Sequence, residues 1–251
     1  MKKLNKYHVD EMRLIQLMDP EHQINNKMIG HRVLAHAERA GAVAADQHGS
    51  RKNHKAVTCC LNKVLLTDIF RQKKRAGAIG MNDAKGCYDR IAHAVGVLVL
   101  MSFGVPAMVC QVLFETLQKA EHHIKTGYGR SGVMYGNEEV PLQGIGQGNG
   151  LGPTLWALIS TKLIQMTFEA GHGVTLLSSI TLHVMHLVCF AFADDTDLTI
   201  AGQHADVTGE SIFSDFLAAL DRWAGGADRD RRCVVPREIV LLFNKFPMDW
   251  Q

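Results

Sequence analysis

The chain has 251 residues, of which 47% are hydrophobic and 21% are charged, and its formal net charge at pH 7 is only +2. This length and apolar content can bury a substantial core, in one large domain or in two smaller lobes. The small net charge excludes a protein that attracts nucleic acid through a basic field over its whole surface. The N-terminus lacks the apolar segment of a signal peptide, and the six cysteines show no paired framework. We therefore expect a reduced, intracellular protein without a membrane segment.

Two helices are expected first along the chain. Apolar residues at helical spacing predict them over residues 26–44 and 55–73. The second helix lies within a basic block, because residues 51–75 contain eight Lys or Arg and a single acid, Asp68. Such a block suits contacts with phosphates, although a solvated helix face is the simpler alternative.

The middle of the chain alternates strands and helices. A short strand is predicted from Ala78 to Asn82, and the acid Asp83 follows it. Helices over 90–101 and 106–121, a glycine-rich hairpin over 122–141, and a glycine loop that leads into a helix over 153–170 come next. Without repeated β-α-β units, this order predicts an α+β fold, an antiparallel sheet with helices on one face.

Two neighbouring acids, Asp194 and Asp195, are the most informative residues of the sequence. They lie between an apolar run that ends at Phe192 and a second one that begins at Leu198, which predicts a tight β-hairpin with both acids at its turn. Two like charges at one turn are unfavourable unless a cation neutralises them. With Asp83 as a third acid, the pattern predicts a cage for a divalent metal. The alternative is that both acids only form the turn.

The end of the chain is less informative. A helix is predicted over residues 208–223, and Gly225-Gly226 is expected to end it. Residues 225–251 fit no clear element, apart from a lone strand from Ile239 to Phe243.

Three stretches of the sequence resemble, in order, the three palm motifs of reverse transcriptases, which are RNA-directed DNA polymerases. They are Asn82-Asp-Ala-Lys-Gly-Cys-Tyr-Asp-Arg-Ile91, Pro141-Leu-Gln-Gly-Ile-Gly-Gln-Gly-Asn-Gly-Leu-Gly-Pro153 and Phe192-Ala-Asp-Asp195. Upstream, Met12-Arg-Leu-Ile-Gln-Leu-Met18 followed by Asn26-Lys-Met-Ile-Gly-His-Arg32 resembles the fingers segment of the non-LTR retrotransposon type. Gln47-His-Gly-Ser-Arg-Lys52 resembles the fingers stretch just before the palm.

The resemblance implies a right-hand polymerase palm with partial fingers. Residues 1–76 are then a fingers-like segment, residues 77–224 the palm, and residues 225–251 an unassigned tail. No stretch resembles a thumb, so we expect a partner, or a longer polyprotein, to supply one.

The same resemblance implies the roles of the acids. Asp83 and Asp194 would bridge two Mg²⁺ ions, with Mn²⁺ as a substitute, Asp195 would support them, and the carbonyl of Ala84 would add a ligand. Nucleotidyl transfer uses two such ions ~3.5–4 Å apart, and Mg²⁺ prefers carboxylate oxygens, so three aspartates suit this chemistry.

Five further residues are expected to contact the nucleotide by resemblance. Tyr88 would exclude a ribose 2′-hydroxyl and so select dNTPs, Gln147 and Gly148 would line the nucleotide and the template, and Arg13 and Arg51 would neutralise the triphosphate. A core tyrosine, a structural glycine turn and two surface arginines are the respective alternatives. We expect Asp89 to orient a loop by hydrogen bonding rather than to bind metal.

The expected function is RNA-directed DNA synthesis, with an RNA template, a DNA or RNA primer and dNTPs as partners and no membrane. The first alternative is a truncated, catalytically silent retroelement remnant that at most binds nucleic acid. The second is a glycosyltransferase that binds a UDP-sugar through Asp195-Thr-Asp197. Zinc-ligand spacings and the G-x-S-x-G motif of serine hydrolases do not occur in the sequence.

Overall fold

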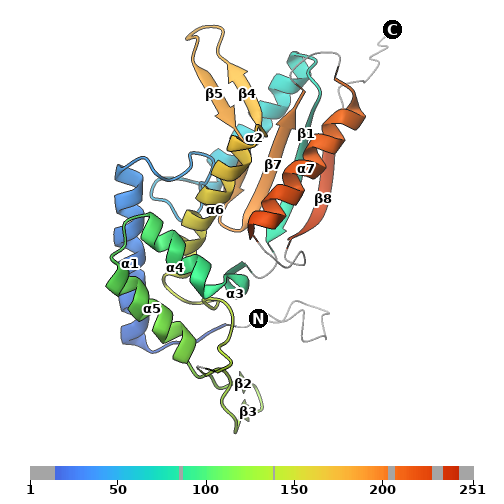
Figure 1. Ribbon diagram of the computed structural model, residues 1–251. Helices are drawn as coiled ribbons and strands as arrows, with labels where there is room; N and C mark the ends of the chain where they lie inside the picture. Colours follow the sequence, from blue (N-terminus) through green and yellow to red (C-terminus); the bar gives the residue numbers. More distant parts are fainter. Residues whose placement is uncertain (1–14, 85–86, 138, 203–206, 228–233, 243–251) are drawn as a thin grey trace. The chain divides into compact units, whose positions relative to one another are not determined.

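The computed structural model describes residues 15–84, 87–137, 139–202, 207–227 and 234–242 (Figure 1), without the side chains of residues 83, 84 and 224 onward. The chain divides into two compact units. We call residues 1–42 with 86–158 the helical unit, and residues 43–85 with 159–251 the sheet unit. Each unit is made of two separate stretches of sequence, so the unit boundaries cut across the predicted fingers and palm segments.

The sheet unit contains a four-stranded antiparallel sheet in the order β6-β7-β1-β8. The strands are β1 (Gly77–Ala84), β6 (Cys189–Phe192), β7 (Asp195–Ala201) and β8 (Val234–Leu242). The antiparallel sheet of the predicted α+β fold is therefore confirmed. The strand expected near the end of the chain is present as β8, and it is not alone, because it pairs with β1 along the length of that strand.

Helices cover both faces of this sheet, whereas the sequence predicted helices on one face only. A β-carbon at Gly77 would lie 2.5 Å from the ring of Phe70 in α2 (Ala56–Gln72), and one at Gly80 would lie 1.9 Å from Phe216 in α7 (Gly209–Ala227). Residues 77 and 80 are an odd number of positions apart on β1, so they face opposite sides. The neighbours Ala78 and Ile79 are accordingly both buried, as expected for a strand that is covered on both faces.

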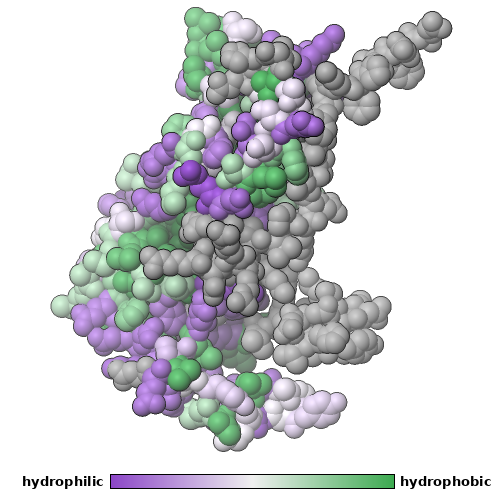
Figure 2. All heavy atoms as spheres, turned by 45° about the vertical axis from the view of Figure 1, so that its right-hand side comes forward, coloured by the Kyte–Doolittle hydropathy of each residue, from purple (hydrophilic) through white to green (hydrophobic). Residues whose placement is uncertain are grey.

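Three further elements complete the sheet unit. A hairpin of β4 (Val174–Leu177) and β5 (Val184–Leu187) extends from it, and α6 (Gly152–Glu169) belongs to it from residue 159 onward. On the face drawn in Figure 2, hydrophobic residues gather at the tip of this hairpin, where Ile180 and Leu182 are exposed. Gly225 and Gly226 lie within α7, so the prediction that they end this helix is wrong.

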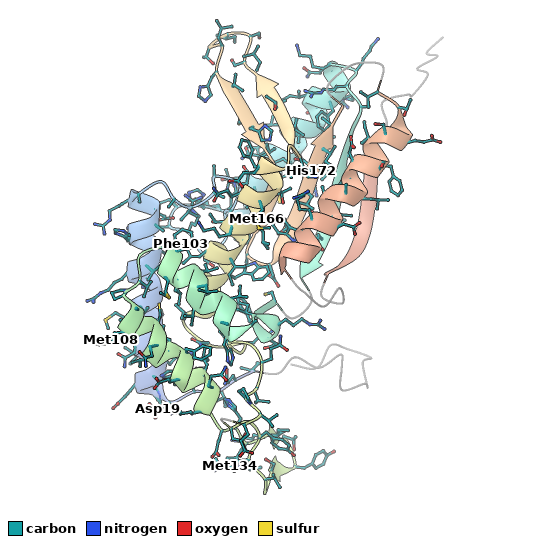
Figure 3. All side chains as sticks on the ribbon, in the orientation of Figure 1. Asp19, Phe103, Met108, Met134, Met166 and His172 are labelled. Carbon is teal, nitrogen blue, oxygen red and sulfur yellow. The ribbon has the colours of Figure 1, made fainter. Side chains whose placement is uncertain are left out.

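The helical unit is built from α1 (Pro20–Arg39), α3 (Cys87–Arg90), α4 (His93–Ser102) and α5 (Ala107–Lys119), with a short hairpin of β2 (Lys125–Thr126) and β3 (Gly129–Arg130). Helix α1 begins six residues before the predicted start. The side chain of Asp19, which is labelled in Figure 3, accepts a hydrogen bond from the backbone N–H of Glu21. Pro20 occupies the first turn of the helix. This cap and the fixed φ of proline favour helix initiation at that point.

None of the described helices combines the length and the apolar character that a membrane-spanning segment needs.

We predict that Gly80→Ala destabilises the sheet unit by about 1–3 kcal/mol, because the new methyl group would overlap the ring of Phe216, which is completely buried and cannot move aside. Urea unfolding measures the change. Gly132→Ala is the matched control, since a β-carbon there meets no atom within 4 Å; its effect should stay within about ±0.5 kcal/mol. Equal effects of the two substitutions would contradict the packing of α7 on β1.

Candidate active site

The three predicted metal-binding acids lie on neighbouring strands of the sheet unit. Phe192 of β6 pairs with Asp195 of β7, so Ala193 and Asp194 form a two-residue turn. The predicted hairpin is confirmed, but only Asp194 lies in its turn, because Asp195 is the first residue of β7. In the register between β1 and β7, the backbone of Asp83 lies directly opposite Asp195. The fold therefore brings all three backbone positions to the same end of the sheet, although the side chain of Asp83 lies outside the described residues.

The turn itself has an unusual backbone. Ala193 has φ of +57°, in the left-handed region that residues with a β-carbon rarely adopt. Such a conformation costs about 1–3 kcal/mol and persists only where the surroundings hold it. Here the contacts come from residues 46–49, which run beside β6; Gln47 forms a parallel β-bridge with Ala191.

Gln47 and Gly49 hold this turn. The fully buried side chain of Gln47 donates from Nε2 to Ser160 Oγ at 2.8 Å and to the carbonyl of Ala193 at 3.4 Å, and its Oε1 accepts from the N–H of Gly49 at 2.7 Å. A β-carbon at Gly49 would lie 2.0 Å from the backbone nitrogen of Ala193, so only glycine fits there. The sequence identified this segment as fingers-like but missed its contact with the acid-bearing turn.

Asp46 attaches the same segment to β6. Its Oδ2 accepts hydrogen bonds from the N–H groups of Val188 at 2.7 Å and Cys189 at 3.2 Å, and its carbonyl accepts from Ala191 at 3.0 Å. Burial raises the pKa of this carboxyl above its ordinary value, and the two N–H donors and the charge of His186 oppose that shift only in part. Asp46 is therefore a structural acid, which sequence reasoning did not single out.

The two predicted triphosphate-binding arginines are placed differently. Arg51 donates from Nη1 to the carbonyls of Ala44 at 3.0 Å and Gln47 at 2.9 Å, so part of its guanidinium stabilises the segment that holds the turn. Arg13 lies outside the described residues. The contact of either residue with a triphosphate stays a prediction.

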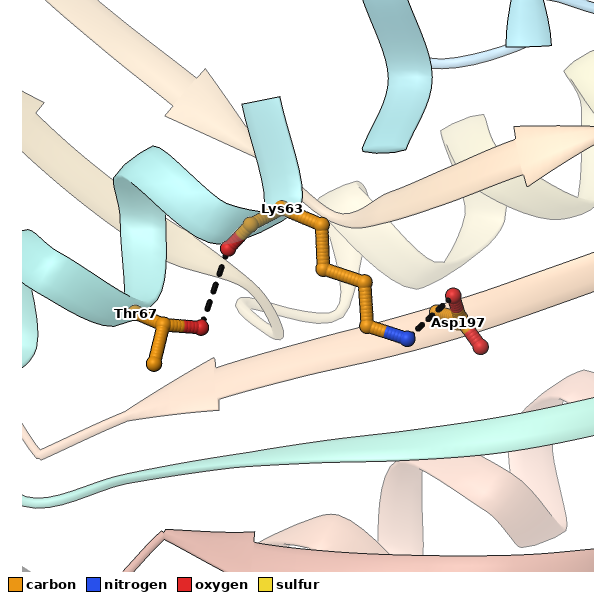
Figure 4. A network of polar contacts seen from close by, with 3 residues as sticks. All are labelled: Lys63, Thr67 and Asp197. Carbon is orange, nitrogen blue, oxygen red and sulfur yellow. Dashed lines mark hydrogen bonds and ion pairs between the residues drawn. The ribbon is translucent and has the colours of Figure 1, made fainter. Parts of the chain in front are cut away.

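Asp197 is a further acid on β7, two residues after Asp195 and hence on the same side of the strand. Figure 4 shows its partner, Lys63 of α2, whose Nζ lies 2.8 Å from Asp197 Oδ2. The ammonium reduces the local excess of negative charge beside the acid-bearing turn. One member of the predicted basic block is thus used inside the sheet unit, and not on a solvated helix face.

The helical unit brings together Tyr88, Asp89 and the glycine loop. The carbonyl of Tyr88 accepts from the N–H of Ile145 at 2.9 Å, and the carboxylate of Asp89 accepts from the backbone N–H of Gln147. Burial raises the pKa of Asp89, and the hydrogen bond from Gln147 opposes this shift. The prediction that Asp89 orients a loop is confirmed.

Amide side chains of α1 fix the other side of the glycine loop. Gln23 donates from Nε2 to the carbonyl of Gly148, and its Oε1 accepts from the N–H of Gly150 at 2.8 Å. The buried Asn26 donates to Asn149 Oδ1 at 3.0 Å. A carboxamide carries both a donor and an acceptor, so it can bind two backbone groups of different polarity at once. Sequence reasoning missed these residues, because nothing in α1 itself indicates a partner more than a hundred residues away.

The donor set at the end of the sheet suits a hard divalent cation. Asp194 in the turn and Asp195 at the start of β7 supply carboxylate oxygens at neighbouring positions, and Mg²⁺ binds through one or two carboxylates while it keeps several waters. No cluster of three or more His, Cys, Asp or Glu side chains that would hold a metal occurs among the described residues, a set that excludes the side chain of Asp83. The carboxylates of Asp194 and Asp195 are, however, the type of ligand that the expected ions prefer.

Comparison with known families decides the classification of the chain. Residues 2–225 match the family model described as reverse transcriptase (RNA-dependent DNA polymerase). The chain belongs to the reverse transcriptase family. No curated protein matches the chain significantly in sequence.

Solved structures with a similar fold include telomerases. Telomerase from Candida albicans in complex with the TWJ fragment of telomeric RNA has a TM-score of 0.58 and 11% sequence identity over 86% of this chain. Candida tropicalis telomerase, in its apo form truncated from the C-terminal domain and in complex with the TWJ fragment, has TM-scores of 0.53 and 0.51, with 12% identity over 88% of this chain. The chain spans 34%, 40% and 38% of the lengths of these three structures.

We predict that the stability of the Asp46→Asn variant relative to the wild type of this reverse transcriptase-family chain increases as the pH rises from about 4 to about 7. Because the pKa of Asp46 is raised in the folded protein, its protonated carboxyl contributes stability in full at a pH below the ordinary pKa of 3.8. This contribution is lost as the pH rises through the folded-state pKa. Asparagine does not titrate, and its Oδ1 can accept the same two N–H groups.

Urea unfolding of both proteins at the two pH values measures the difference. Asp68→Asn, on the exposed side of α2 beside Arg71, is the control. A stability difference at Asp46 that does not change with pH would contradict this account of its burial.

Proposed function

We propose that the chain is the catalytic core of an RNA-directed DNA polymerase that adds dNTPs to a primer 3′-hydroxyl with two Mg²⁺ ions. The observation that carries the proposal is the convergence of Asp83, Asp194 and Asp195 at one end of two neighbouring antiparallel strands, in a chain of the reverse transcriptase family. We further propose the non-LTR retrotransposon type, on the resemblance of the fingers segments.

In this proposal each residue has one task. Carboxylates of Asp83, Asp194 and Asp195, with the carbonyl of Ala84, hold the two ions. When bound, the ions activate the 3′-hydroxyl and stabilise the leaving pyrophosphate. Because the acid-bearing turn is fixed by Gln47 and the Gly49 backbone, the carboxylates are held in place before substrate arrives, and little reorganisation is needed during the reaction.

Selection of the nucleotide is assigned to the helical unit. Tyr88 lies beside Gly152, where an added β-carbon would come within 3.4 Å of its ring, and Gln147 is held by the neighbouring Asp89. A bulky ring near the sugar discriminates by an unfavourable contact with a ribose 2′-hydroxyl. The template is RNA, the primer is DNA or RNA, and a thumb from a partner or from a longer polyprotein supplies further contacts with the duplex.

The alternatives receive less support. The glycosyltransferase interpretation needs Asp197 as a metal ligand, but its Oδ2 is bound by Lys63 at 2.8 Å. The described residues contain no feature that favours a silent remnant over an enzyme, and the three acids are intact.

We expect Asp194→Asn to lower primer extension on an RNA template by about 10³-fold or more, because the substitution removes a negative ligand from the metal pair. The measurement is single-nucleotide extension with purified chain, dNTPs and Mg²⁺. Asp221→Asn, an exposed residue of α7, serves as the matched control and should keep full activity. Extension that survives Asp194→Asn would refute the assignment of the acids.

We expect Tyr88→Val to reduce the preference for dNTP over rNTP by about 10- to 100-fold, since a smaller side chain leaves room for the 2′-hydroxyl. The ratio of kcat/KM for dTTP and UTP on the same primer and template measures the preference. Tyr88→Phe retains the ring and should retain the preference. An unchanged ratio in Tyr88→Val would assign Tyr88 to the core alone.

A further inference from the structure

Two buried polar residues adjoin the acids on the strands that carry them. Asn82 directly precedes Asp83 on β1, and Thr196 directly follows Asp195 on β7. The register of the two strands makes Asn82 and Thr196 direct cross-strand partners. Asn82 is only 3% exposed and Thr196 only 2%. This polar pair is therefore the cross-strand pair next to that of Asp83 and Asp195.

This pair points to the side of the sheet that α7 covers. Gly80, two residues before Asn82, faces Phe216 of α7, and the pairing of β1 with β7 is regular over this stretch. Side chains two positions apart share a face, so Asn82 and Thr196 lie on the α7 side, and the adjoining acid position Asp195 lies on the other.

Neither residue has its hydrogen bonds satisfied within the part of the chain that the structure describes. Asn82 Oδ1 and Thr196 Oγ1 are both buried and have no hydrogen-bond partner, the other residue of the pair included. Thr199, on the same strand and equally buried, is different, because its hydroxyl donates to the carbonyls of Val188 at 3.0 Å and Leu187 at 3.2 Å. Buried oxygens without a partner are rare in proteins, because they lose their hydration without compensation.

We propose that one buried water molecule bridges Asn82 Oδ1 and Thr196 Oγ1, and that the resulting polar link holds the spacing of the two acid-bearing strands. β-carbons of direct cross-strand partners lie about 4.5–5.5 Å apart, a separation that one water can bridge with two hydrogen bonds. Both oxygens can accept from this water, and buried waters typically bind polar groups that the protein leaves unsatisfied.

The link makes Asn82 and Thr196 positioning residues for the acids. In this proposal they touch neither metal nor substrate, but Asn82 is the sequence neighbour of Asp83 and Thr196 that of Asp195. The distance between their strands therefore sets the distance between the backbones of the two acids. This functional consequence depends on the proposed polymerase reaction. The water bridge itself does not, and the two are tested separately.

Thermal unfolding tests the bridge, with Thr199→Val as the matched control. Valine has nearly the shape of threonine but lacks the hydroxyl. If the water bridges the pair, Thr196→Val loses satisfied hydrogen bonds and lowers Tm by about 2–6 °C, as Thr199→Val does, whereas Thr196→Ser, which keeps the hydroxyl, lowers it less. If the pair is dry, Thr196→Val removes an unsatisfied oxygen and Tm stays the same or rises, which would overturn the proposal.

A double variant provides a test of the water bridge that does not depend on a single substitution. Asn82→Leu and Thr196→Val should each lower Tm, and the double variant should lose clearly less than the sum of the two, because either substitution alone already breaks the link. Strictly additive losses would also overturn the proposal.

Titration with Mg²⁺ tests the positioning role. We expect Thr196→Val to raise the Mg²⁺ concentration for half-maximal primer extension by about 10-fold, the usual effect of losing a residue that orients metal ligands, while Thr196→Ser restores the wild-type value. An unchanged Mg²⁺ requirement would reject the positioning role.

If the wild type extends no primer, the proposed function fails. The rise of Tm with Mg²⁺ concentration then provides the readout for the positioning role. The water bridge is still tested by the valine variants.

Discussion

The antiparallel register between β1 and β7 is the constraint on which the site depends. It sets Asp83 opposite Asp195, and it places Asn82 and Thr196 together one position further along the strands. Because the side-chain period of a strand is two, a shift of β1 by one residue would send the side chains of β1 to the opposite face. The burial of Ala78 and Ile79 on the two faces opposes such a shift.

The site is fixed by backbone contacts as much as by side chains. A close approach between Gly49 and Ala193 and the hydrogen bonds of Gln47 hold the turn that carries Asp194. In the helical unit, Gln23 plays a comparable role for the glycine loop. In both cases a side-chain carboxamide binds a loop that has many glycines or an unfavourable φ, and so supplies the rigidity that the loop sequence itself lacks.

The sequence predicted the features that are encoded locally. The apolar alternation around Asp194 predicted the hairpin, and the acid Asp89, next to Tyr88, was correctly expected to orient a loop. The contacts missed by sequence reasoning join residues that are distant in the chain. Gln47 to Ala193 and Lys63 to Asp197 leave no periodic pattern, and the presence of helices on both faces follows from how β1 is covered. The early start of α1 was predictable, because Asp19-Pro20 is a capping signal in its own right.

The central position of β1 has a consequence for how the protein folds. Its residues pair with β7 partners about 120 residues later in the chain and with β8 partners later still, so the sheet needs long loops to close before it gains any pairing energy. The backbones of Asp83 and Asp195 therefore come together only after these long loops have closed. An ion that binds only the finished sheet stabilises the folded state by mass action. For the proposed metal site, a higher Mg²⁺ concentration is thus expected to raise the free energy of unfolding of the chain.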